Sequence, residues 1–156
     1  MNKKLIIKYF LQFLVIVLIG AGIFFGIGYY RYRTSPEYHK YQDLLAQKER
    51  YMADTYGGDT PEETLELFIS ALKTGDIDLA SKYFVLDKQE EWRGNLNNVK
   101  SANKITEMTF DLERKKYKND ISDGQVSFSI ANDQKQVALT ILVAKNVNNK
   151  WKILDL

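Results

Sequence analysis

The stretch Tyr9–Tyr30, YFLQFLVIVLIGAGIFFGIGYY, decides how this chain is organised. It carries no charged side chain, and Gln12 is its one large polar residue. At about 1.5 Å per residue, a helix of this length spans the roughly 30 Å hydrocarbon core of a bilayer. A helix also pairs its backbone polar groups internally, which lipid requires. The stretch therefore predicts a membrane-spanning helix at residues 9–30, with membrane lipid as its partner.

A cleaved signal peptide is the alternative interpretation of this stretch. Its apolar run is longer than the ~7–15 residues of a signal core, and no A-x-A-like cleavage site ends it. Tyr9 and Phe10 at one end, and Tyr29 and Tyr30 at the other, are residues typical of the two membrane interfaces. These features favour a retained anchor.

The anchor contains a G-x-x-x-G pattern formed by Gly22 and Gly26. Small residues at this spacing let two membrane helices approach closely. Glycine is also common in membrane helices without any such role. Helix packing through Gly22 and Gly26 is therefore one of two interpretations.

Basic residues on both sides of the anchor bear on its orientation. They are Lys3, Lys4 and Lys8 before it, and Arg31, Arg33 and Lys40 after it. Together with the amino terminus, the first group gives a slight bias toward a cytoplasmic N-terminus. We expect a single-pass protein of the cell membrane, with residues 1–8 as a short cytoplasmic head and the C-terminal domain outside the cytoplasm.

Composition excludes several functions for the remainder of the chain. Residues 1–33 hold five of the 22 Lys and Arg residues and none of the 20 Asp and Glu residues, so the rest has a net charge of 17 − 20 = −3. A mildly acidic domain argues against a nucleic-acid partner. Cysteine is absent, and the one histidine, His39, lies near the anchor. The sequence therefore predicts no metal site and no cofactor.

Helix signals fill the first half of the soluble part. Residues 31–58 predict a juxtamembrane helical stalk that starts at Ser35-Pro36 or at a Thr34/Glu37 capping box and stops at Gly57-Gly58. Residues 59–156 then form one domain. Its three predicted helices begin at Thr60-Pro61, at Asp76, and at an Asp87/Glu90 capping box.

From Lys104 onward the hydrophobic period changes to two. Four segments alternate in this way: ITEMTFDLERKKYK, QVSFSIA, KQVALTILVAK and KWKILDL. Turns at residues 119–124, 132–133 and 146–149 link them as an antiparallel sheet. Helices followed by strands indicate an α+β fold. We expect three helices packed on a curved four-stranded antiparallel sheet, after an N-terminal transmembrane helix.

Residues 59–156 also carry a familiar pattern. Its parts are Asp59-Thr60-Pro61-Glu62-Glu63, then Phe68-x-x-Ala71-Leu72-x-x-Gly75-Asp76, then Ala80-x-x-Tyr83-Phe84, and finally Asn149-Lys150-Trp151-Lys152-Ile153. This pattern resembles the nuclear transport factor 2-like (cystatin-like) superfamily, in particular its membrane-anchored bacterial members of unknown function. The resemblance implies a cone-shaped α+β roll with a pocket.

What the resemblance implies about function is broad, because its motifs are fold motifs. Some relatives are enzymes, such as ketosteroid isomerases and polyketide cyclases, and others are binding or assembly domains. Inner-membrane components of type IV secretion machines and N-terminal domains of some penicillin-binding proteins share the plan of an anchor and a roll. Fold alone does not choose among these functions.

Candidate site residues follow from the predicted strand register. The polar register opposite the apolar one holds Glu107, Thr109, Asp111, Ser127, Ser129 and Thr140. If this register lines a pocket, Asp111 is the candidate acid or base. If it faces outward, the other five are candidate interface positions, since such rolls often pair through the sheet face. Tyr83 and Trp92 either line a pocket mouth or belong to the core.

The sequence thus favours a membrane-anchored, non-catalytic extracytoplasmic domain that binds a protein partner or forms a homodimer. One alternative is a small-ligand-binding protein or an isomerase-like or cyclase-like enzyme that uses the roll pocket. Another is an assembly component of a secretion or cell-wall machine. Known components of that kind usually have a longer cytoplasmic tail than MNKKLIIK.

Overall fold

The computed structural model describes residues 3–132 and 134–156, with side chains from residue 7 onward. Two compact units make up the chain, Met1–Glu49 and Arg50–Leu156. The first consists of helix α1 (Lys3–Arg33) and most of helix α2 (Pro36–Ala53). The second contains the last turn of α2 and all the remaining elements.

Helix α1 contains the predicted membrane segment. Over Ile7–Arg33 it has a mean hydropathy of 2.6 and buries none of its side chains. Among the described residues it is the one helix whose length and composition suffice to cross a membrane. Helix α2 starts as predicted from Ser35, whose Oγ accepts a hydrogen bond from the Tyr38 N–H at 3.2 Å. It ends at Ala53, before the predicted stop at Gly57-Gly58.

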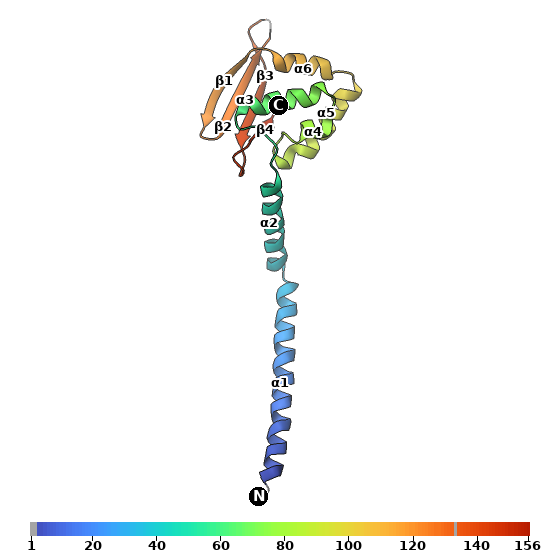
Figure 1. The fold of residues 1–156 in the computed structure, drawn as a ribbon, viewed down its shortest axis with the longest axis vertical. Helices are drawn as coiled ribbons and strands as arrows, with labels where there is room; N and C mark the ends of the chain where they lie inside the picture. The colour runs from blue at the N-terminus through green and yellow to red at the C-terminus, as the bar shows by residue number, and fades with distance from the viewer. Residues whose placement is uncertain (1–2, 133) are drawn as a thin grey trace. The chain divides into compact units, whose positions relative to one another are not determined.

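The second unit is α+β, with helices before strands, as predicted. Its helices are α3 (Pro61–Lys73), α4 (Ile77–Ser81), a short 3-10 helix η1 (Leu86–Lys88), α5 (Gln89–Ser101) and α6 (Ile105–Glu113). Its strands are β1 (Lys116–Ser122), β2 (Gln125–Ala131), β3 (Val137–Lys145) and β4 (Trp151–Asp155). The strands form one antiparallel sheet in the order β1-β2-β3-β4, and the helices lie on one side of it (Figure 1).

One predicted strand is a helix. Residues 105–113 form α6, so this unit has four α-helices among its described residues rather than three. The alternation that predicted a strand is real, but the segment also places Ile105, Met108 and Leu112 at helical spacing. A segment this short fits both periods. The first strand consequently starts at Lys116 and continues through part of the predicted turn at residues 119–124.

Two of the three predicted helix caps in this unit are confirmed. Thr60 Oγ1 accepts from the Glu63 N–H at 3.1 Å, and Asp76 Oδ1 accepts from the Leu79 N–H at 2.9 Å. The Asp87/Glu90 capping box is wrong, because α5 begins after η1 without a side-chain cap. The Asp87 carboxylate instead accepts a hydrogen bond from the Tyr51 hydroxyl.

The core lies between α3–α6 and the inner face of the sheet. Phe68 of α3 and Phe84 are completely buried and meet edge to face at 5.4 Å, and Trp92 of α5 stacks on Phe84 at 4.5 Å. The inner face of the sheet contributes six buried or half-buried side chains: Val126, Phe128, Ile130, Leu139, Ile141 and Val143. This register confirms the predicted apolar faces of β2 and β3.

Strand β4 is enclosed on both edges. β3 pairs with one edge. On the other edge, the Trp151 N–H donates to Gly58 O at 2.9 Å, and the Ile153 N–H donates to Tyr83 O at 2.9 Å. Gly57 allows this approach, because it has φ +118° and an added Cβ would lie 2.3 Å from Trp151 O.

Gly57→Ala should therefore destabilise the domain by at least about 1 kcal/mol, since the new methyl group meets a left-handed φ and a backbone oxygen. Gly94→Ala is the matched control: it lies in α5 with open space around its Cβ. It should raise the free energy of unfolding by roughly 0.5–1 kcal/mol. Both are measured by urea unfolding of the full chain in detergent. Trp92 and Trp151, both in the second unit, provide the fluorescence signal. Equal effects of the two variants would contradict the prediction.

Candidate functional site

The outer face of the sheet is a broad uncharged surface on three strands. Its positions are Tyr117, Asn119 and Ser122 on β1, Gln125, Ser127 and Ser129 on β2, and Thr140, Leu142 and Ala144 on β3. We call these nine residues the outer sheet face. Ser129 pairs with both Tyr117 and Thr140, and Ser127 pairs with both Asn119 and Leu142. The structure thus brings the predicted positions Ser127, Ser129 and Thr140 together.

Charge is excluded from this face although charged residues make up 27% of the chain. The charged residues of β1, Lys116, Lys118 and Asp120, lie opposite Ile130, Phe128 and Val126 and so belong to the inner register. In that register, Lys118 forms an ion pair of 3.0 Å with Glu62 of α3. On the outer side, charge first appears in β4, where Ala144 pairs with Lys152 and Leu142 with Asp155.

Two predicted interface positions lie elsewhere. Glu107 and Thr109 are on α6 and not on the sheet, because residues 105–113 are helical. Thr109 is buried, and its Oγ1 donates to Thr106 O at 2.9 Å. Glu107 is exposed. Neither residue extends the outer sheet face.

Glu107 and Asp111 instead lie at a groove between α5, α6 and β3. The groove has a volume of about 380 Å³. Its lining is largely apolar: Trp92, Val99, Met108, Leu112, Leu139 and Leu156, with Lys104, Glu107 and Asp111 as its charged members. The predicted pocket residue Trp92 and the candidate Asp111 therefore share one site, together with Glu107.

Asp111 is poorly suited to acid–base chemistry in this groove. Its side chain is 51% exposed and forms an ion pair with Arg114 at 3.3 Å. A catalytic carboxyl group is usually activated by burial or by an unusual neighbour, and an exposed ion pair at the end of a helix provides neither. Phe110, in the same helix, is 64% exposed.

Tyr83 belongs to the core and not to a pocket mouth. It is 7% exposed, and burial raises the pKa of its phenol. Trp92 is half-buried, because one face of its indole stacks on Phe84 while it also borders the groove. The two aromatic candidates thus have different positions, and Trp92 alone is part of the groove.

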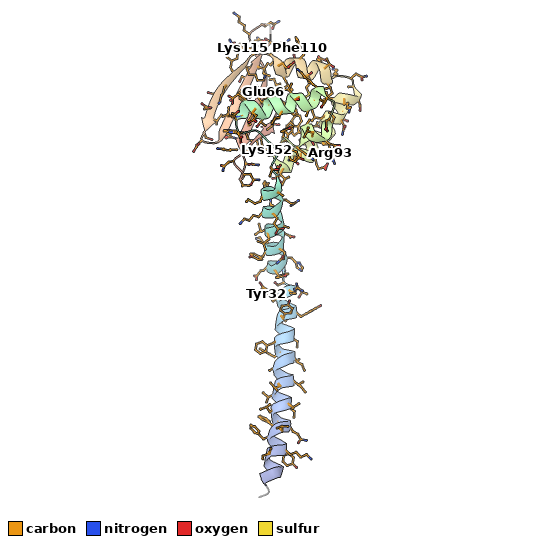
Figure 2. The ribbon with its side chains drawn as sticks, viewed as in Figure 1. Tyr32, Glu66, Arg93, Phe110, Lys115 and Lys152 are labelled. Atoms are coloured by element: carbon orange, nitrogen blue, oxygen red, sulfur yellow. The ribbon has the colours of Figure 1, made fainter. Side chains whose placement is uncertain are left out.

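Sequence reasoning missed a buried ion pair at β4. Lys152, labelled in Figure 2, is completely buried. Its Nζ lies 2.7 Å from Asp54 Oδ2 and 2.6 Å from Lys82 O. Burial lowers the pKa of the Lys152 ammonium group, and the hydrogen bond and charge of Asp54 oppose that shift. Gln89 Nε2 also donates to Asp54 Oδ2, at 3.3 Å. The one available signal was the alternation of Trp151, Lys152 and Ile153 in a strand.

The turn between β3 and β4 holds the chain from Tyr51 to Asp54. The Asn148 side-chain amide donates to the carbonyl oxygens of Tyr51, Met52 and Asp54 at 2.9–3.1 Å. These include carbonyl groups of the last turn of α2, which have no partner within the helix. The predicted turn at residues 146–149 is confirmed, and it also caps α2.

The remaining predicted positions lie in the first unit. Gly22 and Gly26 are in α1, and an added Cβ at either would meet nothing within 4 Å. The described residues include no group of three or more His, Asp or Glu side chains placed to hold a metal ion. His39 lies in α2, with its ring 6.1 Å from that of Tyr38.

Comparison with known proteins adds no relative: the chain matches no protein-family model, no curated protein sequence and no solved structure.

Removal of the Lys152 ammonium group tests the buried pair. Lys152→Met should lower the free energy of unfolding by about 3–5 kcal/mol, because it leaves the Asp54 carboxylate buried without a cation. Lys150→Met is the control, since Lys150 pairs with Asp59 at 2.7 Å on the surface and an exposed pair contributes at most about 1 kcal/mol.

The double variant Asp54→Leu/Lys152→Met should recover most of this loss, because no unpaired charge remains buried. Urea unfolding of the full chain in detergent, followed by tryptophan fluorescence, measures all four proteins. A loss for Lys152→Met no larger than that for Lys150→Met would show that the pair is not structural.

Proposed function

We propose that this chain is a single-pass membrane protein that presents a non-catalytic binding domain outside the cytoplasm. The domain would assemble with itself or with a protein partner through the outer sheet face. The observation that carries this proposal is the absence of charge on that face, over three strands of a chain rich in charged residues. An uncharged face loses little hydration free energy when it is covered.

The location is supported by α1 and its flanks. Ile7–Arg33 is long and apolar enough to cross a membrane, and none of this span is buried. The slight excess of positive charge before the span favours a cytoplasmic N-terminus. Under this proposal α1 anchors the chain, and residues from 34 onward lie outside the cytoplasm.

The fold relationship is part of the proposal. Helices α3 and α4 followed by four antiparallel strands are compatible with the nuclear transport factor 2-like roll suggested by the sequence pattern. Helix α6, directly before β1, would be an addition to the three-helix pattern. Assembly within a secretion or cell-wall machine would be a special case of the same binding role.

The size of the outer sheet face indicates a weak interaction that depends on the membrane. Three strands about 4.8 Å apart, each with roughly 20 Å of length, give a flat area of roughly 300 Å². A stable complex in solution usually buries about 800 Å² per partner. Anchoring to one membrane raises the effective concentration of two partners, which can compensate for a small interface.

Orientation is tested with single cysteines, because the chain has none of its own. Ser70→Cys, at an exposed position on α3, should react with a membrane-impermeant maleimide added to intact cells. Asn2→Cys should react only after the membrane is permeabilised. The reverse result would overturn the proposed orientation, and release of the labelled chain by alkaline carbonate would overturn the anchor.

The interface is tested by adding charge to the outer sheet face. Ser129→Glu/Thr140→Glu should reduce amine-specific crosslinks of the chain in membranes at least about tenfold, because it would bury two carboxylates without partners. Ser70→Glu/Thr106→Glu makes the same changes at exposed positions on α3 and α6 and should leave crosslinking unchanged. Equal crosslinking in both double variants would contradict the proposed interface.

Small-ligand binding is a second candidate, favoured by the apolar groove beside Trp92. A volume of about 380 Å³ lies in the range of ligand sites, which runs from about 300 to 1,000 Å³.

If the groove binds an apolar ligand, Val99→Trp should fill it and abolish the enhanced fluorescence of anilinonaphthalenesulfonate. Ser70→Trp, at an exposed position on α3, should leave that signal unchanged. An unchanged signal in Val99→Trp would exclude this groove as the site.

A further inference from the structure

Side-chain packing within the first unit is concentrated at the junction of α1 and α2. Ser35 and Tyr38 are half-buried there, whereas every other described side chain of residues 7–49 is exposed. The junction follows directly on the apolar span: α1 ends at Arg33, α2 begins at Pro36, and Tyr32 marks the position in Figure 2. Ser35 Oγ closes it, donating to Tyr32 O at 2.7 Å and accepting from the Tyr38 N–H.

This closure brings aromatic rings from both helices around one guanidinium group. Arg33 Cζ lies 5.6 Å from the centre of the Tyr29 ring, in the same helix, and 5.9 Å from that of Tyr38, in the next helix. The Tyr38 ring meets the Tyr32 ring edge to face at 5.4 Å. Such contacts fix the direction of a side chain that is otherwise flexible.

The charge of Arg33 is not neutralised by the protein. Residues 1–36 contain no Asp or Glu. Within the described part of the chain no carboxylate forms an ion pair with Arg33. Its guanidinium group is thus oriented by two phenols and placed at the end of an apolar helix. In a membrane this is the depth of the lipid headgroups, where phosphate is the abundant anion.

We propose that Tyr29, Arg33 and Tyr38 form a binding site for the phosphate of an anionic lipid headgroup. The planar guanidinium donates parallel hydrogen bonds to phosphate oxygens, and the phenols hold it in position. This inference rests on the proposed membrane anchoring of α1. It also accounts for basic residues at the end of the span that faces away from the cytoplasm, where the orientation rule does not require them.

Arg31 provides an internal control for this site. At about 100° per residue it lies on roughly the opposite side of α1 from Arg33. Replacing either arginine removes one positive charge at the same membrane depth, but only Arg33 contacts Tyr29 and Tyr38. A site made by the tyrosines therefore predicts unequal effects, whereas general attraction between charges predicts equal ones.

The experiment uses the full chain in phosphatidylcholine vesicles that contain a trace of spin-labelled phosphatidylglycerol or spin-labelled phosphatidylcholine. Electron paramagnetic resonance gives the fraction of each lipid immobilised by the protein, and hence the preference for the anionic lipid. Arg33→Gln should lower this preference about fivefold, the effect of one basic residue held at an anionic membrane surface, because the two phenols hold its guanidinium group in place. Tyr38→Leu should lower it as well, and Arg31→Gln should lower it by less than twofold.

Further measurements distinguish a lipid headgroup from free phosphate as the ligand, and failure of the headgroup site from failure of the membrane anchor. Inorganic phosphate, compared with chloride at matched ionic strength, should leave the preference unchanged if a lipid headgroup is the ligand. Competition by inorganic phosphate, or equal losses in Arg31→Gln and Arg33→Gln, would overturn the proposed site. If neither lipid is immobilised by the unmodified chain, the membrane anchoring itself fails. Immobilised lipid without an anionic preference would refute only the headgroup site.

Discussion

The ion pair between Lys152 and Asp54 is the contact on which the arrangement of the second unit depends. A buried ammonium group requires its full set of partners, because the loss of hydration is not otherwise compensated. The Asp54 carboxylate and Lys82 O provide them. These partners come from the segment after α2 and from the end of α4, so that three distant parts of the chain must meet at β4. The pair therefore specifies an arrangement, even where its net contribution to stability is small.

Enclosure of β4 follows from this constraint. Because Asp54 is held at Lys152, the residues that follow it, Gly57 and Gly58, run along the edge of β4 that does not pair with β3. The segment from Tyr83 to Val85 bonds to the same edge at Ile153. β1 is left as the exposed edge of the sheet, and there a register shift and alternating charges discourage further pairing. For the proposed assembly, this arrangement favours contact through a face of the sheet rather than through an edge.

Much of this architecture could be predicted from local signals, and the failures have physical causes. β2 was predicted at its observed bounds, because Val126, Phe128 and Ile130 alternate cleanly with small polar residues. Caps at Thr60 and Asp76 were predicted because a cap is a local hydrogen bond. α6 was mistaken for a strand because nine residues satisfy two periods at once, and only packing of Leu112 and Thr109 against the core decides between them. That error moved Glu107, Thr109 and Asp111 off the sheet.

The candidate sites differ in how much of each could be predicted from the sequence. Ser127, Ser129 and Thr140 were found together because register is a sequence property once strands are known. The groove beside Trp92 was not foreseen as a location, because it needs the position of α6 relative to α5. The ion pair of Lys152 could not be predicted, because its partner, Asp54, is 98 residues away in the sequence and no local pattern relates the two residues.

The charged side chains are unevenly distributed over the domain, and this distribution supports the proposed binding role. On the inner register of β1 and on the helices, cations lie beside carboxylates, as in Lys118 with Glu62 and Lys73 with Glu113. The outer sheet face has neither sign. A sheet face that contacted only water would tolerate Lys and Glu at positions such as Ser129 and Thr140. Lys and Glu are common on the rest of the domain surface. Their exclusion from three adjacent strands is what contact with another apolar or weakly polar surface would require, because each covered charge would need a partner.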